Sequence, residues 1–226
     1  MSLYLLLVIP GMLLTMWAQF QVKSTFNKYA QIGSSLGMTG GEVAAKILQE
    51  MGINNVSVEP IPGELTDHYD PSAKAVRLSE SVYGSTSLAA AAVAAHECGH
   101  VLQDLKGYKP MNIRAALVPV ANLGSNVAPL LIMVGFGLNA AGMFSTIFLD
   151  IGIVLFLGVV LFHVVTLPVE FDASSRALRI IDDLGILQGE ENRAAKKVLN
   201  AAAFTYVATA LYSALQLLQL VLSRRD

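Results

Sequence analysis

Four long stretches of the chain contain no Lys, Arg, Asp or Glu, and each is long enough to form a helix that crosses a lipid bilayer. They cover residues 1–22, 115–149, 151–169 and 198–223. Such helices could also lie buried in a large soluble protein. However, a chain of 226 residues with 14% charged residues has too little polar surface to cover four of them. The pattern therefore predicts a mainly α membrane protein with about four transmembrane helices.

The two terminal stretches are interpreted separately. The first lacks the basic leading segment and the small-residue cleavage site of a secretory signal, so we expect an uncleaved anchor. The last contains Gln216 and Gln219, so it either crosses the membrane or lies along its surface. A turn near residues 139–145 separates the two middle helices. The predicted segments are a transmembrane anchor at 1–22, a soluble segment at 23–114, a two-helix transmembrane hairpin at 115–169 and a C-terminal segment at 170–226.

The soluble segment shows the signals of a small α+β fold. Thr39 and Glu42 have the spacing of a capping box, and apolar residues follow at helical spacing until Gly52. The alternation of residue types then indicates short strands. The predicted strands are residues 56–58, ended by Pro60 and Pro62, and residues 75–78.

A metal-binding motif lies on the next predicted helix, residues 88–105. His96 and His100 are four residues apart, so both imidazoles project from one helix face and can bind one tetrahedral zinc ion. Glu97 lies between them in sequence and can take a proton from a zinc-activated water molecule during peptide hydrolysis. Cys98 points to a different face and is better explained as a small core residue than as a ligand.

Two histidines do not complete a zinc site, and the sequence leaves the third ligand open. No third histidine follows His100 closely, which argues against the metzincin pattern and favours a carboxylate. The next acidic residue after Asp104 is Asp150, and Glu170 follows at the end of the third charge-free stretch. A purely structural zinc site would prefer four closed ligands with thiolates among them.

The residues around these positions resemble those of a known family. Residues 94–103 read Ala-Ala-His-Glu-Cys-Gly-His-Val-Leu-Gln, and residues 167–174 read Leu-Pro-Val-Glu-Phe-Asp-Ala-Ser after two predicted spans. Together they look like the YugP-like family of membrane zinc metallopeptidases, and more distantly like HtpX-type quality-control proteases and CaaX prenyl proteases.

This resemblance implies a zincin-like face, one Zn²⁺ ion per chain and Glu170 as the third ligand, in the gluzincin manner. In the distant relatives, an aspartate four residues after the glutamate supports the zinc histidines. Here that position is Ser174 and the acidic residue is Asp172, so Asp172 is only a candidate for that role.

Other polar residues have open roles. His68 and Tyr69 lie in a predicted loop, Thr66 to Pro71, and either could donate a hydrogen bond to the oxyanion of the reaction; a solvated Asp-Pro turn explains them equally well. His163 is an ionisable residue in an apolar span, but two helical turns, about 10 Å, separate it from Glu170. Arg176 and Arg179 could pair with a substrate carboxylate or with Asp172, or serve as charge anchors at the membrane.

The function expected from the sequence is zinc-dependent endopeptidase activity toward a polypeptide or membrane-protein substrate, with a role in membrane-protein quality control. The alternatives are a non-proteolytic membrane scaffold or chaperone stabilised by zinc, against which Glu97 argues, and a transporter, for which the chain lacks inverted repeats. A net charge of −2 gives no electrostatic case for nucleic-acid binding, and a single cysteine excludes an intrachain disulfide.

The charge distribution predicts a multi-pass protein of a bacterial cytoplasmic membrane with a cytoplasmic catalytic face. The turn between the second and third spans has no Lys or Arg, whereas basic residues flank the opposite ends of the spans. These are Lys23, Lys28, Arg176, Arg179, Lys196 and Lys197. Arg224 and Arg225 disagree with this orientation if the last helix crosses the membrane.

Overall fold

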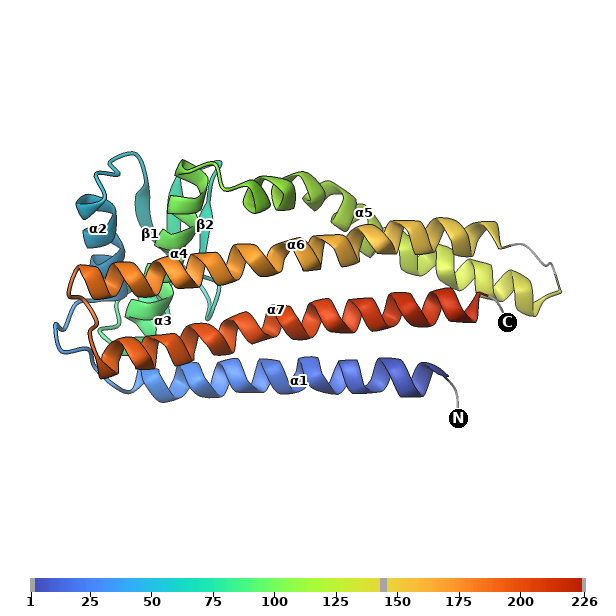
Figure 1. The fold of residues 1–226 in the computed structure, drawn as a ribbon, viewed down its shortest axis with the longest axis horizontal. Coiled ribbons are helices and arrows are strands. Elements are labelled where there is room, and N and C mark those ends of the chain that lie inside the picture. The colour runs from blue at the N-terminus through green and yellow to red at the C-terminus, as the bar shows by residue number, and fades with distance from the viewer. Residues whose placement is uncertain (1–2, 143–145, 225–226) are drawn as a thin grey trace. The chain divides into compact units, whose positions relative to one another are not determined.

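The computed structural model describes residues 3–142 and 146–224 (Figure 1). The helices are α1 (Leu3–Ala30), α2 (Gly40–Glu50), α3 (Glu80–Tyr83), α4 (Leu88–Leu105), α5 (Lys109–Ala140), α6 (Ile147–Asp183) and α7 (Glu190–Ser223). The strands are β1 (Ser57–Ile61), β2 (His68–Asp70) and β3 (Ala75–Ser79). The chain forms two compact units. The first contains residues 1–18, 109–168 and 205–226, and the second contains 19–108 and 169–204.

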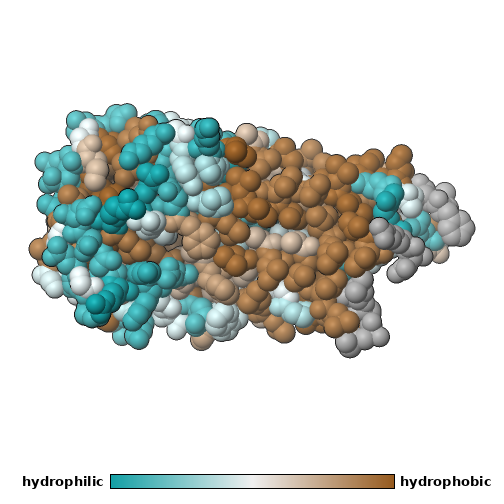
Figure 2. Space-filling model, in the orientation of Figure 1, coloured by the Kyte–Doolittle hydropathy of each residue, from teal (hydrophilic) through white to brown (hydrophobic). Residues whose placement is uncertain are grey.

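The first unit consists of parts of α1, α5, α6 and α7. Glycines let these helices pack closely: a Cβ added at Gly124 would lie 2.5 Å from the carbonyl oxygen of Leu155, and one at Gly11 would lie 2.7 Å from the ring of Tyr212. Large apolar side chains of these helices are exposed, and the face of this unit seen in Figure 2 is mainly hydrophobic. Close contacts through small residues and an apolar exterior are typical of helices packed in lipid.

Four helices in the described part of the chain, α1, α5, α6 and α7, are long and apolar enough to cross a membrane. Together with the small sheet, they confirm the predicted fold class: mainly α, with about four candidate membrane-spanning helices and a small α+β region. The turn predicted near 139–145 falls between α5 and α6, although residues 143–145 lie outside the described residues, as does Arg225.

The second unit contains a three-stranded sheet in the order β1-β3-β2. β1 pairs in parallel with β3, and β2 pairs antiparallel with β3. Two predictions were wrong. The first strand does not end before Pro60, because Pro60 lies on the edge strand β1, where a missing N–H is tolerated. The predicted loop Thr66 to Pro71 contains a strand, because His68–Asp70 pair with β3 although the segment is too short for an alternating pattern.

Helix α4 forms the centre of this unit and begins and ends where the sequence predicts. The Ser87 side chain caps its first turn by accepting from the amide of Ala90, and Gly107 follows its end with a positive φ of 60°. Its apolar face is built mainly from alanine, the best helix former, and these alanines are completely buried. The predicted capping box of Thr39 and Glu42 is confirmed at the start of α2, which packs against α4.

Gly99 brings α4 close to the part of α6 that belongs to the second unit. A Cβ added at Gly99 would lie only 2.5 Å from the carbonyl oxygen of Ala173. Backbone atoms on both sides leave no flexible side chain that could move away. The close packing of the two helices therefore depends on the absence of a side chain at position 99.

We expect Gly99→Ala to destabilise the protein by about 1–3 kcal/mol, because α4 and α6 must move apart. Thermal unfolding in detergent measures the effect. The matched control is Gly84→Ala, since Gly84 has a right-handed backbone with φ −95° and an added Cβ there meets nothing within 4 Å. Equal melting temperatures for the two variants would contradict this account of the packing.

Candidate metal centre

Three side chains from α4 and α6 converge in the second unit. His96 Nε2 lies 3.3 Å from Glu170 Oε2, and His100 Nε2 lies 3.7 Å from the same oxygen. One ligand atom from each of the three residues lies within 4.8 Å of the others, and His100 and Glu170 are buried. Among the described residues, these three side chains form the one group of His, Cys, Asp and Glu residues that could hold a metal ion.

The separations fit a tetrahedral zinc ion. Nitrogen and oxygen ligands lie about 2.0–2.2 Å from zinc, so two of them in a tetrahedron are about 3.3–3.6 Å apart. The distances from Glu170 to the two imidazoles are close to this range before any ion draws the ligands together. Two histidines and one glutamate leave the fourth position open, as in hydrolytic rather than structural zinc sites.

Gln103 holds His100 in the tautomer that a metal requires. The Gln103 amide nitrogen donates to the carbonyl oxygen of Val169 and to Asp172 Oδ2, both at 2.8 Å. Its amide oxygen, which can only accept, therefore faces His100 Nδ1 at 2.9 Å. His100 Nδ1 therefore carries a proton, which leaves Nε2, the nitrogen that faces Glu170, as the atom that can bind a metal once its own proton is lost.

Asp172 and Arg176 extend this network. Arg176 donates from Nε to Asp172 Oδ2 at 2.5 Å and from a terminal nitrogen to Oδ1 at 3.3 Å. Asp172 is thus connected to His100 through the buried side chain of Gln103. His96 is held differently, because its Nδ1 lies 3.1 Å from the Ser174 hydroxyl, which can donate or accept.

Glu97 is a buried carboxyl group beside these ligands, with only 6% of its surface exposed. Burial raises the pKa of Glu97 above its ordinary value of 4.5; the charges of Glu170 and Asp67 act in the same direction, and those of His96 and His100 oppose it. Asp67 lies just before β2 and accepts from the amide and hydroxyl of Ser79. Because the charge of Asp67 contributes to the raised pKa of Glu97, the two carboxyl groups lie within electrostatic range of each other.

Tyr69 and Asp104 connect α4 to the sheet. The Tyr69 hydroxyl donates to Asp104 Oδ2 at 2.8 Å, and the Lys74 ammonium lies 2.6 Å from the same oxygen. Burial, with the hydrogen bond to Asp104, raises the pKa of Tyr69 to about 12. His68 is exposed, and its Nδ1 lies 2.8 Å from the carbonyl oxygen of Thr66. These contacts give both residues structural partners, so their predicted role as oxyanion donors remains a hypothesis.

Two other candidate ligands lie outside the group. Cys98 is fully buried and points to α2, where its Sγ lies 3.8 Å from the carbonyl oxygen of Ala44; burial raises the pKa of its thiol. His163 belongs to the first unit, and its ring packs against that of Phe162 at 5.7 Å. The structure thus brings together His96, His100 and Glu170, and places Cys98 and His163 elsewhere.

Gln103 and Asp67 were missed as site residues by sequence reasoning. Gln103 follows His100 by three residues, which places it on the same helix face, so its spacing was a usable signal. Asp67 lay inside the polar cluster around His68, but nothing in the sequence distinguished it from its neighbours. Its proximity to Glu97 depends on the turn into β2, which was not predicted.

The fold and the site define a membrane-type helical protein with a metallopeptidase motif, and comparisons with known proteins agree. The family model described as "Putative neutral zinc metallopeptidase" matches residues 4–225. A relative from Bacillus subtilis (strain 168), "Putative membrane protease YugP", is 46% identical over 220 residues, which is 97% of this chain and 96% of the relative. No solved structure matches the chain. The chain belongs to this family of zinc metallopeptidases, and the resemblance drawn from residues 94–103 and 167–174 is confirmed.

We expect Gln103→Leu to weaken zinc binding about 10–100-fold, because His100 loses the acceptor that fixes its tautomer. Competition with a zinc-binding dye measures the affinity of the purified protein, and a melting curve verifies that the variant is folded. Gln49→Leu, an exposed position on α2, serves as the control. Unchanged zinc affinity in folded Gln103→Leu protein would show that this hydrogen bond does not prepare the ligand.

Proposed function

We propose that the protein is a zinc-dependent membrane endopeptidase that binds one Zn²⁺ ion through His96, His100 and Glu170. The observation that carries the proposal is the convergence of His96 Nε2, His100 Nε2 and a Glu170 oxygen beside the buried carboxyl of Glu97. The substrate is a polypeptide or a membrane protein. Membership of a zinc metallopeptidase family and the name of the Bacillus relative support this reading.

Zinc held there would supply a Lewis acid that makes water more acidic and polarises the scissile carbonyl. Glu97 acts as the general base: its carboxylate takes a proton from the attacking water and then passes it to the leaving amine. Burial raises the pKa of Glu97, which makes its carboxylate a stronger base for the first of these transfers. Gln103 and Ser174 orient the two imidazoles.

A non-proteolytic scaffold or chaperone with a structural zinc ion is the competing function. Such a protein would gain nothing from a buried carboxyl next to the ligands, since burying an ionisable group is costly. The open fourth position also distinguishes this ligand set from closed structural sites. Both features favour hydrolysis, and membrane-protein quality control is the cellular role we propose.

We expect Glu97→Gln to retain zinc and to lose about 10²–10⁴-fold in the rate of peptide hydrolysis, because the amide keeps the shape of the side chain but cannot act as a base. Turnover of an unfolded protein substrate and zinc content by atomic emission are both measured. His96→Ala is the comparison and should lose zinc as well. Normal turnover by Glu97→Gln would contradict the proposed mechanism.

We also propose a bacterial cytoplasmic membrane location with the catalytic residues on the cytoplasmic side. The basic residues near one end of the spans and the absence of Lys and Arg between α5 and α6 support this orientation. An alkaline phosphatase fusion after residue 60 should be inactive and a fluorescent-protein fusion at the same site should be fluorescent. The opposite pair of results would reverse the orientation.

A further inference from the structure

The strand β1 has a free edge in the second unit. It is the outer strand of the order β1-β3-β2, and among the residues that the structure describes only its inner side is paired. The amide of Ser57 donates to the carbonyl of Lys74, and the parallel register pairs Ser57 with Ala75 and Glu59 with Arg77. Main-chain groups alternate along a strand, so residues 57, 59 and 61 face β3. The N–H and C=O of Val58 therefore point away from the sheet.

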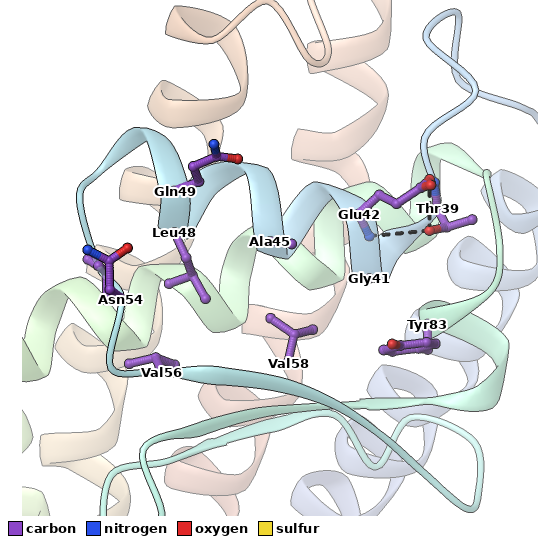
Figure 3. Close-up of a pocket in the computed structure, with 11 residues that line it drawn as sticks. Thr39, Gly41, Glu42, Ala45, Leu48, Gln49, Asn54, Val56, Val58 and Tyr83 are labelled. Atoms are coloured by element: carbon purple, nitrogen blue, oxygen red, sulfur yellow. Dashed lines mark hydrogen bonds between the residues drawn. The ribbon is translucent and has the colours of Figure 1, made fainter.

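A groove runs beside this free edge, between β1 and α2 (Figure 3). Its volume is about 630 Å³. Figure 3 shows Leu48 on α2 and Val58 on β1 pointing toward the same space. Gly41 has no side chain and Ala45 has only a methyl group, so both leave space on the α2 side of the groove. The remaining lining residues are Thr39, Glu42, Gln49, Ile53, Asn54, Val56 and Tyr83.

Pro60 limits where another strand could pair with this edge. It points outward like Val58, but it has no N–H and offers only its carbonyl oxygen. Prolines commonly protect edge strands from unwanted pairing. Here the protection covers one end of β1 and leaves Val58, which borders the groove, with both a donor and an acceptor. The site for pairing thus coincides with the apolar part of the groove.

The charge of the groove suits a neutral polypeptide segment. Glu42, the acidic residue among those that line it, stays charged, but its carboxylate already accepts hydrogen bonds from the amide and the hydroxyl of Thr39. No Lys or Arg is among the residues lining the groove, so it has no obvious affinity for phosphate or nucleic acid. The groove has polar and apolar lining residues, and the apolar ones next to the open main-chain edge, Leu48, Val56 and Val58, match an extended peptide with an apolar side chain.

We propose that this groove binds an extended segment of the substrate polypeptide, which adds to the edge of β1 and inserts alternate side chains between β1 and α2. The inference rests on the proposed peptidase function, because it identifies the occupant as substrate. The metal ligands and Glu97 are not among the lining residues, so the groove is a second contact that holds the polypeptide apart from the reacting bond. Long unfolded substrates gain affinity from it, and short peptides do not.

The test measures binding of fluorescently labelled β-casein, an unfolded polypeptide, to full-length Glu97→Gln protein in detergent micelles. Val58→Pro, added to this background, removes the outward N–H without touching the hydrogen bonds to β3, and should weaken binding about tenfold. Val58→Ala keeps the N–H and should weaken binding less. Glu59→Pro removes a donor of the sheet itself and should lower the melting temperature instead.

A second variant keeps the test independent of strand folding. Ala45→Arg fills the groove from the exposed side of α2 and should also weaken casein binding about tenfold or more. Glu50→Gln gives the same change in charge on that helix, at an exposed position outside the groove, and should bind like the parent protein. In the protein with Glu97 intact, Ala45→Arg should raise KM for casein and leave cleavage of short peptides unchanged.

Parent-like casein binding by folded Ala45→Arg and Val58→Pro proteins would overturn the proposal. A dimer that Val58→Pro converts to monomer in sedimentation would also overturn it, because the edge would then pair with a second copy of the chain. Casein binding is measured in the Glu97→Gln protein without hydrolysis, so the proposed groove and the proposed peptidase function can fail separately. Groove-dependent binding by a wild-type protein that never cleaves casein would retain the groove as a polypeptide site and reject the peptidase function.

Discussion

The close contact between α4 and α6 at Gly99 is the interaction on which the metal centre depends. His96 and His100 lie on either side of this glycine in sequence, and Glu170 lies three residues before Ala173, whose carbonyl oxygen faces Gly99. Helices with side chains at their contact are usually 8–10 Å apart. A glycine at the crossing point lets the imidazoles and the carboxylate approach to 3.3–3.7 Å. The alanines of α4 allow similarly close packing on its other faces.

The buried charges explain why the centre needs a cation. Glu97 and Glu170 are 6% and 3% exposed, and both lie next to imidazoles. Burial alone would lower the pKa of His100, but its hydrogen bond to Glu170 and the charges of Glu97 and Glu170 outweigh that effect and raise it. Without a metal, a proton on His100 partly balances the carboxylates. A divalent cation can replace that proton, so metal binding and protonation compete at this site.

Local patterns in the sequence predicted the elements that local interactions determine. The bounds of α4, the capping box before α2 and the four long apolar helices follow from spacing, caps and composition, and all are present. The pairing of His68–Asp70 with β3 was missed because three residues are too few to show a strand period. Pro60 was read as a strand breaker because sequence alone does not show which strand is the edge.

The candidate site was predictable only where local spacing along the chain determines it. The spacing of His96 and His100 places both on one helix face, whereas Glu170 is 70 residues beyond His100 and was identified through the family resemblance. The role of Gln103 depends on the positions of Val169 and Asp172 on α6. No local sequence pattern around Gln103 indicates these positions. The exposed groove beside β1 depends in turn on the strand order. Apart from the short pairing of β2 with β3, the parts that sequence did not predict are contacts between distant segments.

X-ray absorption at the zinc edge tests the central claim most directly, because it reports the atoms bound to the metal in the intact protein. Purified, zinc-loaded protein should show only nitrogen and oxygen neighbours at about 2.0–2.2 Å, with the multiple-scattering signal of two imidazoles. A sulfur neighbour at about 2.3 Å, which only Cys98 or a methionine could provide, or the signal of a single imidazole, would contradict a centre built from His96, His100 and Glu170.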